Sequence, residues 1–205
     1  GTFQNYKPDN LKFNLPLDVH TNITSTILED RNNRLWVGTA YGLFKFDIEE
    51  KEFINHYKAN DLDSNSINNN NIRDLYQDKS GVIWIGTRGG GINKFNPNTV
   101  FSYIHDNTNL RAVRSIISDK SGSIWISKKN DIYKFNFETK ETKKMLDKQA
   151  SVFYIDNSNT LWIGSLDGLI FKYDNVEDEF EKYRILPSEN NSENNIISFC
   201  QDQNG

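Results

Sequence analysis

One eight-residue phrase constrains the fold of this chain more than any other feature. It starts with Asp, has Gly or Asn at its fourth position, and ends in Leu or Ile, then Trp, then Val or Ile. The four copies are DRNNRLWV at Asp30–Val37, DKSGVIWI at Asp78–Ile85, DKSGSIWI at Asp119–Ile126 and DNSNTLWI at Asp156–Ile163. All four tryptophans lie at its seventh position, spaced 48, 41 and 37 residues apart (36 to 84, 84 to 125, 125 to 162). This period predicts an array of structural repeats.

The residues around each phrase decide between helical and β repeats. A period near 40 residues fits a four-stranded propeller blade or a helical repeat such as HEAT. Each phrase follows a short apolar run and precedes an alternating segment that ends in an aromatic residue. The alternating segments are Leu43–Phe46, Ile92–Phe95, Ile132–Phe135 and Ile170–Tyr173. β-Branched and aromatic residues bounded by turns, with no sustained helical period, predict an all-β fold, a β-propeller of four-stranded antiparallel blades.

The phrase itself predicts a hairpin between the first two strands of a blade. Its fourth position is always Gly or Asn, which adopt positive φ readily, as such a turn requires. Its Asp carboxylate can accept hydrogen bonds from the backbone amides that follow. Its Trp is large enough to fill the space between neighbouring blades. We therefore expect structural roles for Asp30, Trp36, Asp78, Trp84, Asp119, Trp125, Asp156 and Trp162.

These residues resemble a known repeat. The run from Ile72 to Asp78, then Trp84–Thr87 and Gly89–Phe95, is similar to the two-component regulator propeller repeat. The similarity recurs at Ile27–Phe46 and Phe153–Tyr173 and more weakly at Ile116–Phe135. The resemblance implies a propeller in the extracytoplasmic sensor region, periplasmic or at the cell surface, of membrane-anchored bacterial receptors. These are mostly histidine kinases or hybrid two-component regulators, and many resemble carbohydrate sensors.

The phrase also sets the boundaries of the blades. We expect one propeller segment over residues 1–205, with blades at 16–59, 60–103, 104–146 and 147–187. Residues 1–15 would hold an outer strand (Phe3 to Tyr6) of a preceding blade and a connector, and 188–205 the start of another blade, with a strand at Ile196–Gln201. Closed propellers usually have four to eight blades. The expected fold is thus about four complete blades plus partial blades at both ends, a fragment of a larger propeller that forms an open arc or associates end to end.

Composition limits the possible partners but leaves the cellular compartment open. The net charge of −4 and the pI near 5.4 argue against nucleic acid as a partner. Cys200 is the only cysteine, so no internal disulfide can form. The sequence shows neither a signal peptide nor an apolar run near 18 residues, and the expected membrane anchor would lie outside it.

Candidate ligand-binding residues lie in the turns between the second and third strands and in the connectors between blades. In a blade these turns and connectors share one face, and propellers place function on such loops. An aromatic ring, amides and cationic side chains there would suit a saccharide. The candidates are Tyr41, Arg88, Lys128, Lys129, Asp167, Asn22 and Asn70, with His20 and the rest of Asn68–Asn71. Each could instead be an ordinary solvated loop residue.

Charge is unevenly distributed along the chain. Between Arg111 and Lys148 there are ten basic and five acidic residues, a local charge of +5 in a chain of −4. This excess could mark a site for an acidic sugar, a contact with another domain, or a solvated blade edge guarded by lysines. The three histidines have no metal-ligand spacing, and no nucleophile elbow or phosphate loop occurs. We expect no catalytic residues, no metal and no cofactor.

Three hypotheses about function remain open. The first is a non-catalytic sensor module that binds a carbohydrate or other small ligand and signals to a downstream kinase. The second is a scaffold that contacts other blades or domains of the same receptor, or a second copy as a homodimer, without binding a small molecule. The third is a propeller lyase or glycosidase, and a glycosidase requires two carboxylates about 5–10 Å apart.

Overall fold

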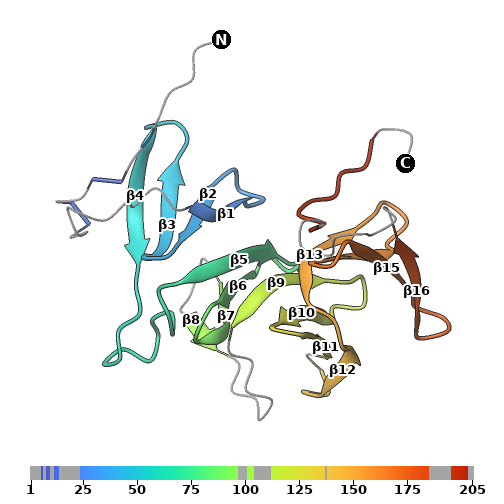
Figure 1. Cartoon of the computed structure of the whole chain (residues 1–205). Helices are drawn as coiled ribbons and strands as arrows, with labels where there is room; N and C mark the ends of the chain where they lie inside the picture. Colours follow the sequence, from blue (N-terminus) through green and yellow to red (C-terminus); the bar gives the residue numbers. More distant parts are fainter. Residues whose placement is uncertain are drawn as a thin grey trace. The chain divides into compact units, whose positions relative to one another are not determined.

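The computed structural model describes residues 6, 8–9, 12–13, 24–96, 101–103, 112–136, 138–184 and 195–202. Contacts divide the chain into two compact units, Gly1–Ala112 and Val113–Gly205. Each unit holds two four-stranded antiparallel sheets, and the described residues contain no helix (Figure 1). The predicted all-β class is confirmed. The predicted strand at Phe3 to Tyr6 lies outside the described residues, apart from Tyr6.

The first unit contains the sheets β1–β4 and β5–β8. The strands of the first sheet are β1 (Thr24–Glu29), β2 (Leu35–Thr39), β3 (Gly42–Asp47) and β4 (Glu52–Tyr57). Those of the second are β5 (Ile72–Gln77), β6 (Ile83–Thr87), β7 (Gly91–Phe95) and β8 (Phe101–Tyr103). In both sheets the strands pair in chain order, which is the arrangement of a propeller blade.

The second unit repeats this pattern. Its first sheet consists of β9 (Val113–Ser118), β10 (Ile124–Lys128), β11 (Asp131–Phe135) and β12 (Thr142–Leu146). Its second sheet consists of β13 (Ala150–Ile155), β14 (Leu161–Ser165), β15 (Leu169–Asp174) and β16 (Glu179–Arg184). We refer to β1–β4, β5–β8, β9–β12 and β13–β16 as blades 1 to 4.

The repeated phrase forms the hairpin between the first two strands of every blade. In the first copy the amide of Asn33 donates to the carbonyl of Asp30 at 2.9 Å, and the same bond closes the other three turns. The residue at the fourth position has a positive φ in each copy: Asn33 (56°), Gly81 (86°), Gly122 (80°) and Asn159 (67°). The left-handed conformation explains why only Gly and Asn occupy this position.

The Asp carboxylate ties each hairpin to its tryptophan. In blade 1, Asp30 Oδ1 accepts hydrogen bonds from the amides of Asn32 (2.9 Å) and Arg34 (3.1 Å). Its other oxygen, Oδ2, accepts from the indole Nε1 of Trp36 at 2.9 Å. The equivalent indole bond is 2.8 Å from Trp84 to Asp78, 2.9 Å from Trp125 to Asp119 and 2.8 Å from Trp162 to Asp156. The sequence predicted the amide contacts but not the indole bond.

Replacing Asp30 with asparagine should lower the free energy of unfolding by about 2 kcal/mol, because hydrogen bonds to a buried charged group are worth about 1.5–3 kcal/mol. Burial alone would raise the pKa of Asp30, but hydrogen bonds from Trp36 and the backbone outweigh it and lower the pKa below 3.8. The unfolded state therefore binds a proton first as pH falls, so this stabilisation is present above pH 3.8 and is lost below it. Urea unfolding measured from neutral to acidic pH should show that the free energy of unfolding falls less with decreasing pH in the variant than in the wild type.

The matched control is Asp47→Asn. Asp47 accepts two backbone amide bonds, from Glu49 and Glu50, in an exposed turn and holds no tryptophan. Asp47→Asn should lower the free energy of unfolding clearly less than Asp30→Asn does. Asp30 also pairs with Arg34, whose Nε lies 2.7 Å from Asp30 Oδ2. Equal losses for the two variants would mean that neither the indole bond nor this ion pair contributes to stability.

The core of the first unit lies between blades 1 and 2. Trp36 and Leu43 of blade 1 pack with Ile72, Leu75 and Phe95 of blade 2. The ring of Phe95, at the end of the third strand, lies 5.2 Å from the indole of Trp36 between centroids. Trp36 is therefore covered by the aromatic residue that ends the third strand of blade 2.

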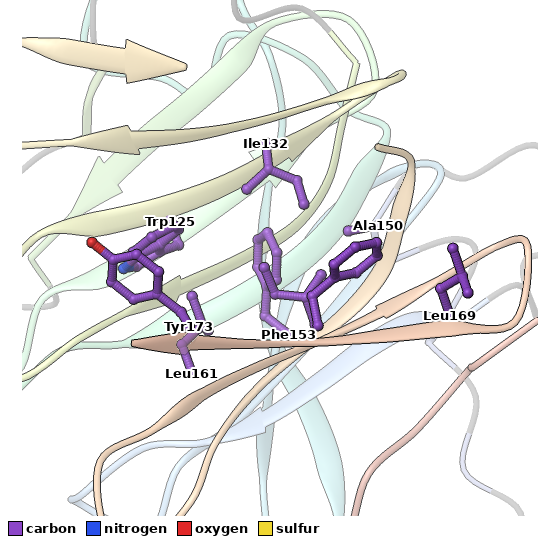
Figure 2. Packing of buried hydrophobic residues seen from close by; sticks show 9 residues of the cluster. Trp125, Ile132, Ala150, Phe153, Leu161, Leu169 and Tyr173 are labelled. Atoms are coloured by element: carbon purple, nitrogen blue, oxygen red, sulfur yellow. The ribbon is translucent and has the colours of Figure 1, made fainter. Parts of the chain in front are cut away.

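The core of the second unit repeats this contact between blades 3 and 4. Figure 2 shows Trp125 beside Tyr173, whose ring centroids lie 4.7 Å apart. Ile132, Phe153 and Leu161 belong to the same cluster. Trp125 is 0% exposed, so the ring fills the space between the two blades.

Residues 195–202 differ from the sequence prediction. The structure assigns no strand at Ile196–Gln201, where one was predicted. The segment nevertheless lies against blade 4, since the amide of Ile196 donates to the carbonyl of Ser165 at 3.1 Å. A single backbone bond does not make a ladder, which explains the missing strand assignment.

Candidate functional site

The turns between second and third strands and the connectors between blades meet within each unit, as the alternation of strand direction requires. In the first unit the amide of Arg88, in the β6–β7 turn, donates to the carbonyl of Asn71 in the β4–β5 connector at 2.9 Å. In the second unit the amide of Leu166, in the β14–β15 turn, donates to the carbonyl of Gln149 in the β12–β13 connector at 3.1 Å.

Tyr41 lies in the β2–β3 turn and is half-buried. Its ring packs against the cluster of Val37 and Phe44, together with Phe13. Its carbonyl lies 2.8 Å from Nε2 of His56, whose ring stacks on Phe44 at a centroid distance of 3.9 Å. The ring of Tyr41 thus helps to cover the apolar side of blade 1.

His56 makes the stability of blade 1 depend on pH. Burial lowers its pKa below 6.5, Lys58 lowers it further, and contact with the Tyr41 carbonyl only partly opposes this. Because the folded state favours the neutral ring, its contribution is present above pH 6.5 and is lost as pH falls through the folded pKa. The free energy of unfolding of the wild type should therefore drop on mild acidification, and His56→Phe, which keeps an aromatic ring, should drop less over the same interval. Urea unfolding measures both free energies at each pH. If they fell by the same amount in the wild type and in His56→Phe, His56 would not be the source of the pH dependence.

The asparagine tract of the first unit holds the connector in place. Asn70 Oδ1 accepts from the amide of Ala59 at 2.7 Å. Asn68 and Asn93 exchange bonds, with the Asn68 amide donating to Asn93 Oδ1 (2.9 Å) and Asn93 Nδ2 to Asn68 Oδ1 (2.8 Å). The side chain of Arg88 is exposed beside this tract. The side-chain oxygens of Asn70 and Asn93 thus hold backbone amides in place, and Arg88 presents an exposed cation beside them.

In the second unit, one lysine joins two carboxylates on the turn-and-connector face of blade 3. Lys144 Nζ lies 2.8 Å from Asp131 Oδ1 and also pairs with Asp147. The Lys144 ammonium lowers the pKa of Asp131 more than burial raises it, and both carboxylates raise the pKa of Lys144. Tyr133 donates from its hydroxyl to Asp131 Oδ2 at 3.3 Å, and Lys128 Nζ lies 5.7 Å from the Tyr133 ring centroid. The ring therefore links a cation to the acidic pair.

A second ion pair lies in the adjoining connector and the turn of blade 4. Lys148 Nζ lies 2.9 Å from Asp167 Oδ2, and Ser165 donates from its hydroxyl to the other oxygen of the same carboxylate. Burial would raise the pKa of Asp167, but Ser165 and Lys148 together lower it. Lys148 directly follows Asp147 in the chain, so the two networks adjoin.

These two networks form the candidate site. We call it the charged cluster, and its members are Lys128, Asp131, Tyr133, Lys144, Asp147, Lys148, Ser165 and Asp167. The side chains of Lys144 and Asp147 are 43% and 83% exposed. Exposed ion pairs contribute about 0–1 kcal/mol, so a ligand can redirect them at little cost in stability. Lysines, carboxylates and a phenol together offer donors and acceptors for a hydroxylated ligand.

The structure brings only part of the predicted residue set together. Lys128 and Asp167 belong to the charged cluster, and Lys129 lies exposed in the β10–β11 turn with a φ of 43°. Tyr41, Arg88 and Asn70 belong to the first unit. Asn22 and His20 lie outside the described residues. Sequence reasoning did not single out Tyr133, Lys144, Asp147 and Lys148 as ligand candidates, although the excess of basic residues from Arg111 to Lys148 marked this region.

Two further observations concern metal ions and membrane-spanning helices. Among the residues that the structure describes, no group of three or more His, Cys, Asp or Glu side chains is arranged to hold a metal ion. In the described part of the chain there is also no helix long and apolar enough to cross a membrane.

The fold and the phrase define a class of protein: a β-propeller in which an aspartate–tryptophan hairpin joins the first two strands of each blade. Residues 19–41 and 66–89 match the family described as "Two component regulator propeller". Two of the four copies of the repeat therefore match this family, and the resemblance predicted from the sequence is confirmed. A comparison with curated proteins found no match.

Solved structures share this fold. The extracellular domain of a proposed hybrid two component system from Bacteroides thetaiotaomicron superposes with a TM-score of 0.72 at 22% identity, covering 89% of this chain and 26% of that one. A second such domain from this organism gives 0.68 at 19% identity, with coverage of 83% and 26%. Virginiamycin B lyase from Staphylococcus aureus gives 0.65 at 13% identity, with coverage of 85% and 59%. The chain spans about a quarter of the length of the two Bacteroides domains.

Proposed function

We propose that this chain is part of the ligand-sensing propeller of a bacterial two-component receptor, located outside the cytoplasm. The observation that carries the proposal is the match of two repeats to the two component regulator propeller family. The shared fold of extracellular domains of proposed hybrid two component systems supports it. The propeller would bind a carbohydrate or other small ligand, and the receptor would signal to a downstream kinase.

The charged cluster is the region of the described residues that best suits such a ligand. Its side chains lie on the turn-and-connector face, where propellers bind ligands, and they are not part of the apolar contact between blades 3 and 4. Tyr133 offers a ring beside Lys128 and Asp131. A sugar can use such a ring for stacking and the neighbouring charges for hydroxyl hydrogen bonds.

The carboxylates favour binding over hydrolysis. A glycosidase needs one carboxylic acid with a raised pKa as its proton donor. Asp131 and Asp167 have lowered pKa values, so both stay ionised at neutral pH. Asp131 and Asp167 are thus poor general acids, and we propose that this segment is non-catalytic.

Thermal unfolding in the presence of a panel of neutral and acidic oligosaccharides tests the proposal. A ligand at 100 times its Kd should stabilise the folded state by about 2.7 kcal/mol. For a domain of this size that corresponds to a rise in Tm of roughly 5–10 °C. If no saccharide in the panel raises the Tm, the scaffold hypothesis replaces the carbohydrate sensor.

A further inference from the structure

The turn-and-connector face of blade 3 carries charge at positions where blade 4 is neutral. Three residues after its tryptophan, at the end of the second strand, blade 3 has Lys128 and blade 4 has Ser165. A bulge in the first strand, opposite this position, holds Arg114 in blade 3 and Ser151 in blade 4. Blade 3 therefore has two cations where blade 4 has two hydroxyl groups.

In blade 4 these two hydroxyl groups serve the fold. Ser165 is 1% exposed, and its hydroxyl accepts from the amide of Leu169 at 3.0 Å. The hydroxyl of Ser151 donates to the carbonyl of Gly164 at 2.9 Å. Arg114, by contrast, is exposed on blade 3. Blade 3 thus replaces groups that bind the blade's own backbone with cations that a ligand can reach.

The turn between β10 and β11 adds a third cation, Lys129. It is exposed and has a φ of 43°, a left-handed conformation that strains a residue with a Cβ. The other three turns of this kind take their positive φ at a glycine: Gly42 (123°), Gly91 (77°) and Gly168 (75°). Lys51 and Lys140 are also left-handed, in turns at the opposite end of their blades. The conformation alone therefore marks no site, and Lys129 differs because it adjoins two further cations.

The charge balance at this face leaves positive charge for a ligand. The carboxylates of the charged cluster are already paired with its own lysines, Lys144 and Lys148. Within the described ranges of the chain, neither Arg114 nor Lys129 forms an ion pair with a carboxylate. Neighbouring cations attract an anionic ligand, and a guanidinium can bind a carboxylate or a sulfate through two parallel hydrogen bonds.

We propose that the ligand of the charged cluster is an acidic oligosaccharide, and that Arg114, Lys128 and Lys129 bind its carboxylate or sulfate groups. We call these three residues the cationic row. This inference rests on the proposed function and names the ligand class of the same site.

The cationic row and the charged cluster together extend across the whole width of blade 3. Arg114 lies on β9, Lys128 on β10 and Lys144 on β12, and the four strands pair in this order. Adjacent strands lie about 4.8 Å apart, so these positions span roughly 14 Å. A chain of several acidic sugar units can contact such a row at more than one unit, which a single small anion cannot do.

Isothermal titration calorimetry with matched pairs of oligosaccharides tests the ligand class. One pair is tetragalacturonate and its neutral methyl ester, and the other is a sulfated carrageenan tetrasaccharide and its desulfated form. The acidic member of at least one pair should bind at least about tenfold more tightly than its neutral partner, because hydrogen bonds to charged groups are the stronger ones. The pair that shows the difference distinguishes carboxylate from sulfate. Added salt should weaken binding of the acidic member only.

Two variants test the cationic row, and a third is their control. Lys129→Gly removes a cation and suits the left-handed backbone, so the Tm should not fall while the affinity for the acidic ligand falls about tenfold. Arg114→Gln should weaken the same ligand by a similar factor. Lys140→Gly makes the same change at another left-handed lysine of blade 3, in the turn between β11 and β12, and should keep wild-type affinity.

Three outcomes would overturn the inference. Equal affinities for the acidic and neutral members would refute the acidic ligand class and leave the carbohydrate sensor in place. Wild-type affinity in both Lys129→Gly and Arg114→Gln would refute the assignment of the cationic row. If neither these pairs nor any saccharide of the thermal panel bound, the inference would fall together with the proposed function.

Discussion

Replacing Trp125 with alanine should lower the free energy of unfolding of the second unit by about 3–5 kcal/mol. The ring is fully buried between blades 3 and 4, in contact with Tyr173, and its loss leaves a cavity in that core. The change also removes the indole bond to Asp119. A buried carboxylate that loses a donor adds to the cost of the cavity. Urea unfolding followed by circular dichroism measures the loss as a lower midpoint.

Trp162→Ala is the matched control for this prediction. Trp162 holds the same place in its phrase and makes the same indole bond, to Asp156. Its ring is only half-buried, so its replacement removes less packing and should cost clearly less than Trp125→Ala. Equal costs would contradict the assignment of packing between blades as the main role of these tryptophans.

Replacing Gly42 with alanine should lower the free energy of unfolding of the first unit by about 3 kcal/mol, combining backbone strain and overpacking. Gly42 begins β3 with a φ of 123°, a conformation that alanine rarely adopts. A Cβ there would also collide with the carbonyl oxygen of Tyr57 and lie 2.8 Å from Nε2 of His56. Backbone in β4 cannot move aside without breaking its pairing with β3. The urea midpoint of the variant, compared with that of the wild type, measures the effect.

Gly122→Ala is the control that separates backbone strain from the steric overlap of a Cβ with its neighbours. Gly122 also has a positive φ, of 80°, but a Cβ there would meet no atom within 4 Å. Its substitution should therefore cost only the backbone strain, about 1 kcal/mol. If Gly122→Ala proved as costly as Gly42→Ala, the contact with Tyr57 and His56 would not be the cause of the larger loss.

The fold could be predicted because the repeated phrase carries local information. Positive φ at Asn33 or Gly81 and amide bonds to Asp30 follow from turn chemistry within a few residues. The bond from Trp36 to Asp30 depends on where the second strand directs the indole ring, which composition does not reveal. The strand predicted at Ile196–Gln201 failed for a related reason, because strand assignment requires a partner ladder and not only an apolar run.

The candidate site was harder to predict because its residues meet through long-range contacts. Lys144 and Asp131 are thirteen positions apart in sequence, and only the pairing of β11 with β12 brings them together. Asn70 is a predicted ligand-binding residue, and the sequence does not show that its side-chain oxygen accepts a hydrogen bond from the backbone amide of Ala59. The basic excess between Arg111 and Lys148 indicated the right region without showing which lysines would gather there.

The measurement that tests most directly whether the charged cluster binds the sensed ligand is isothermal titration calorimetry with the saccharide that most raises the Tm. Lys144→Met combined with Lys148→Met removes both bridging ammonium groups, while Lys143→Met removes a neighbouring lysine that pairs with Asp178 instead. We expect at least about tenfold weaker binding for the double variant, equivalent to about 1.4 kcal/mol, and wild-type affinity for Lys143→Met. Unchanged affinity in the double variant would contradict the assignment of the ligand site to the charged cluster.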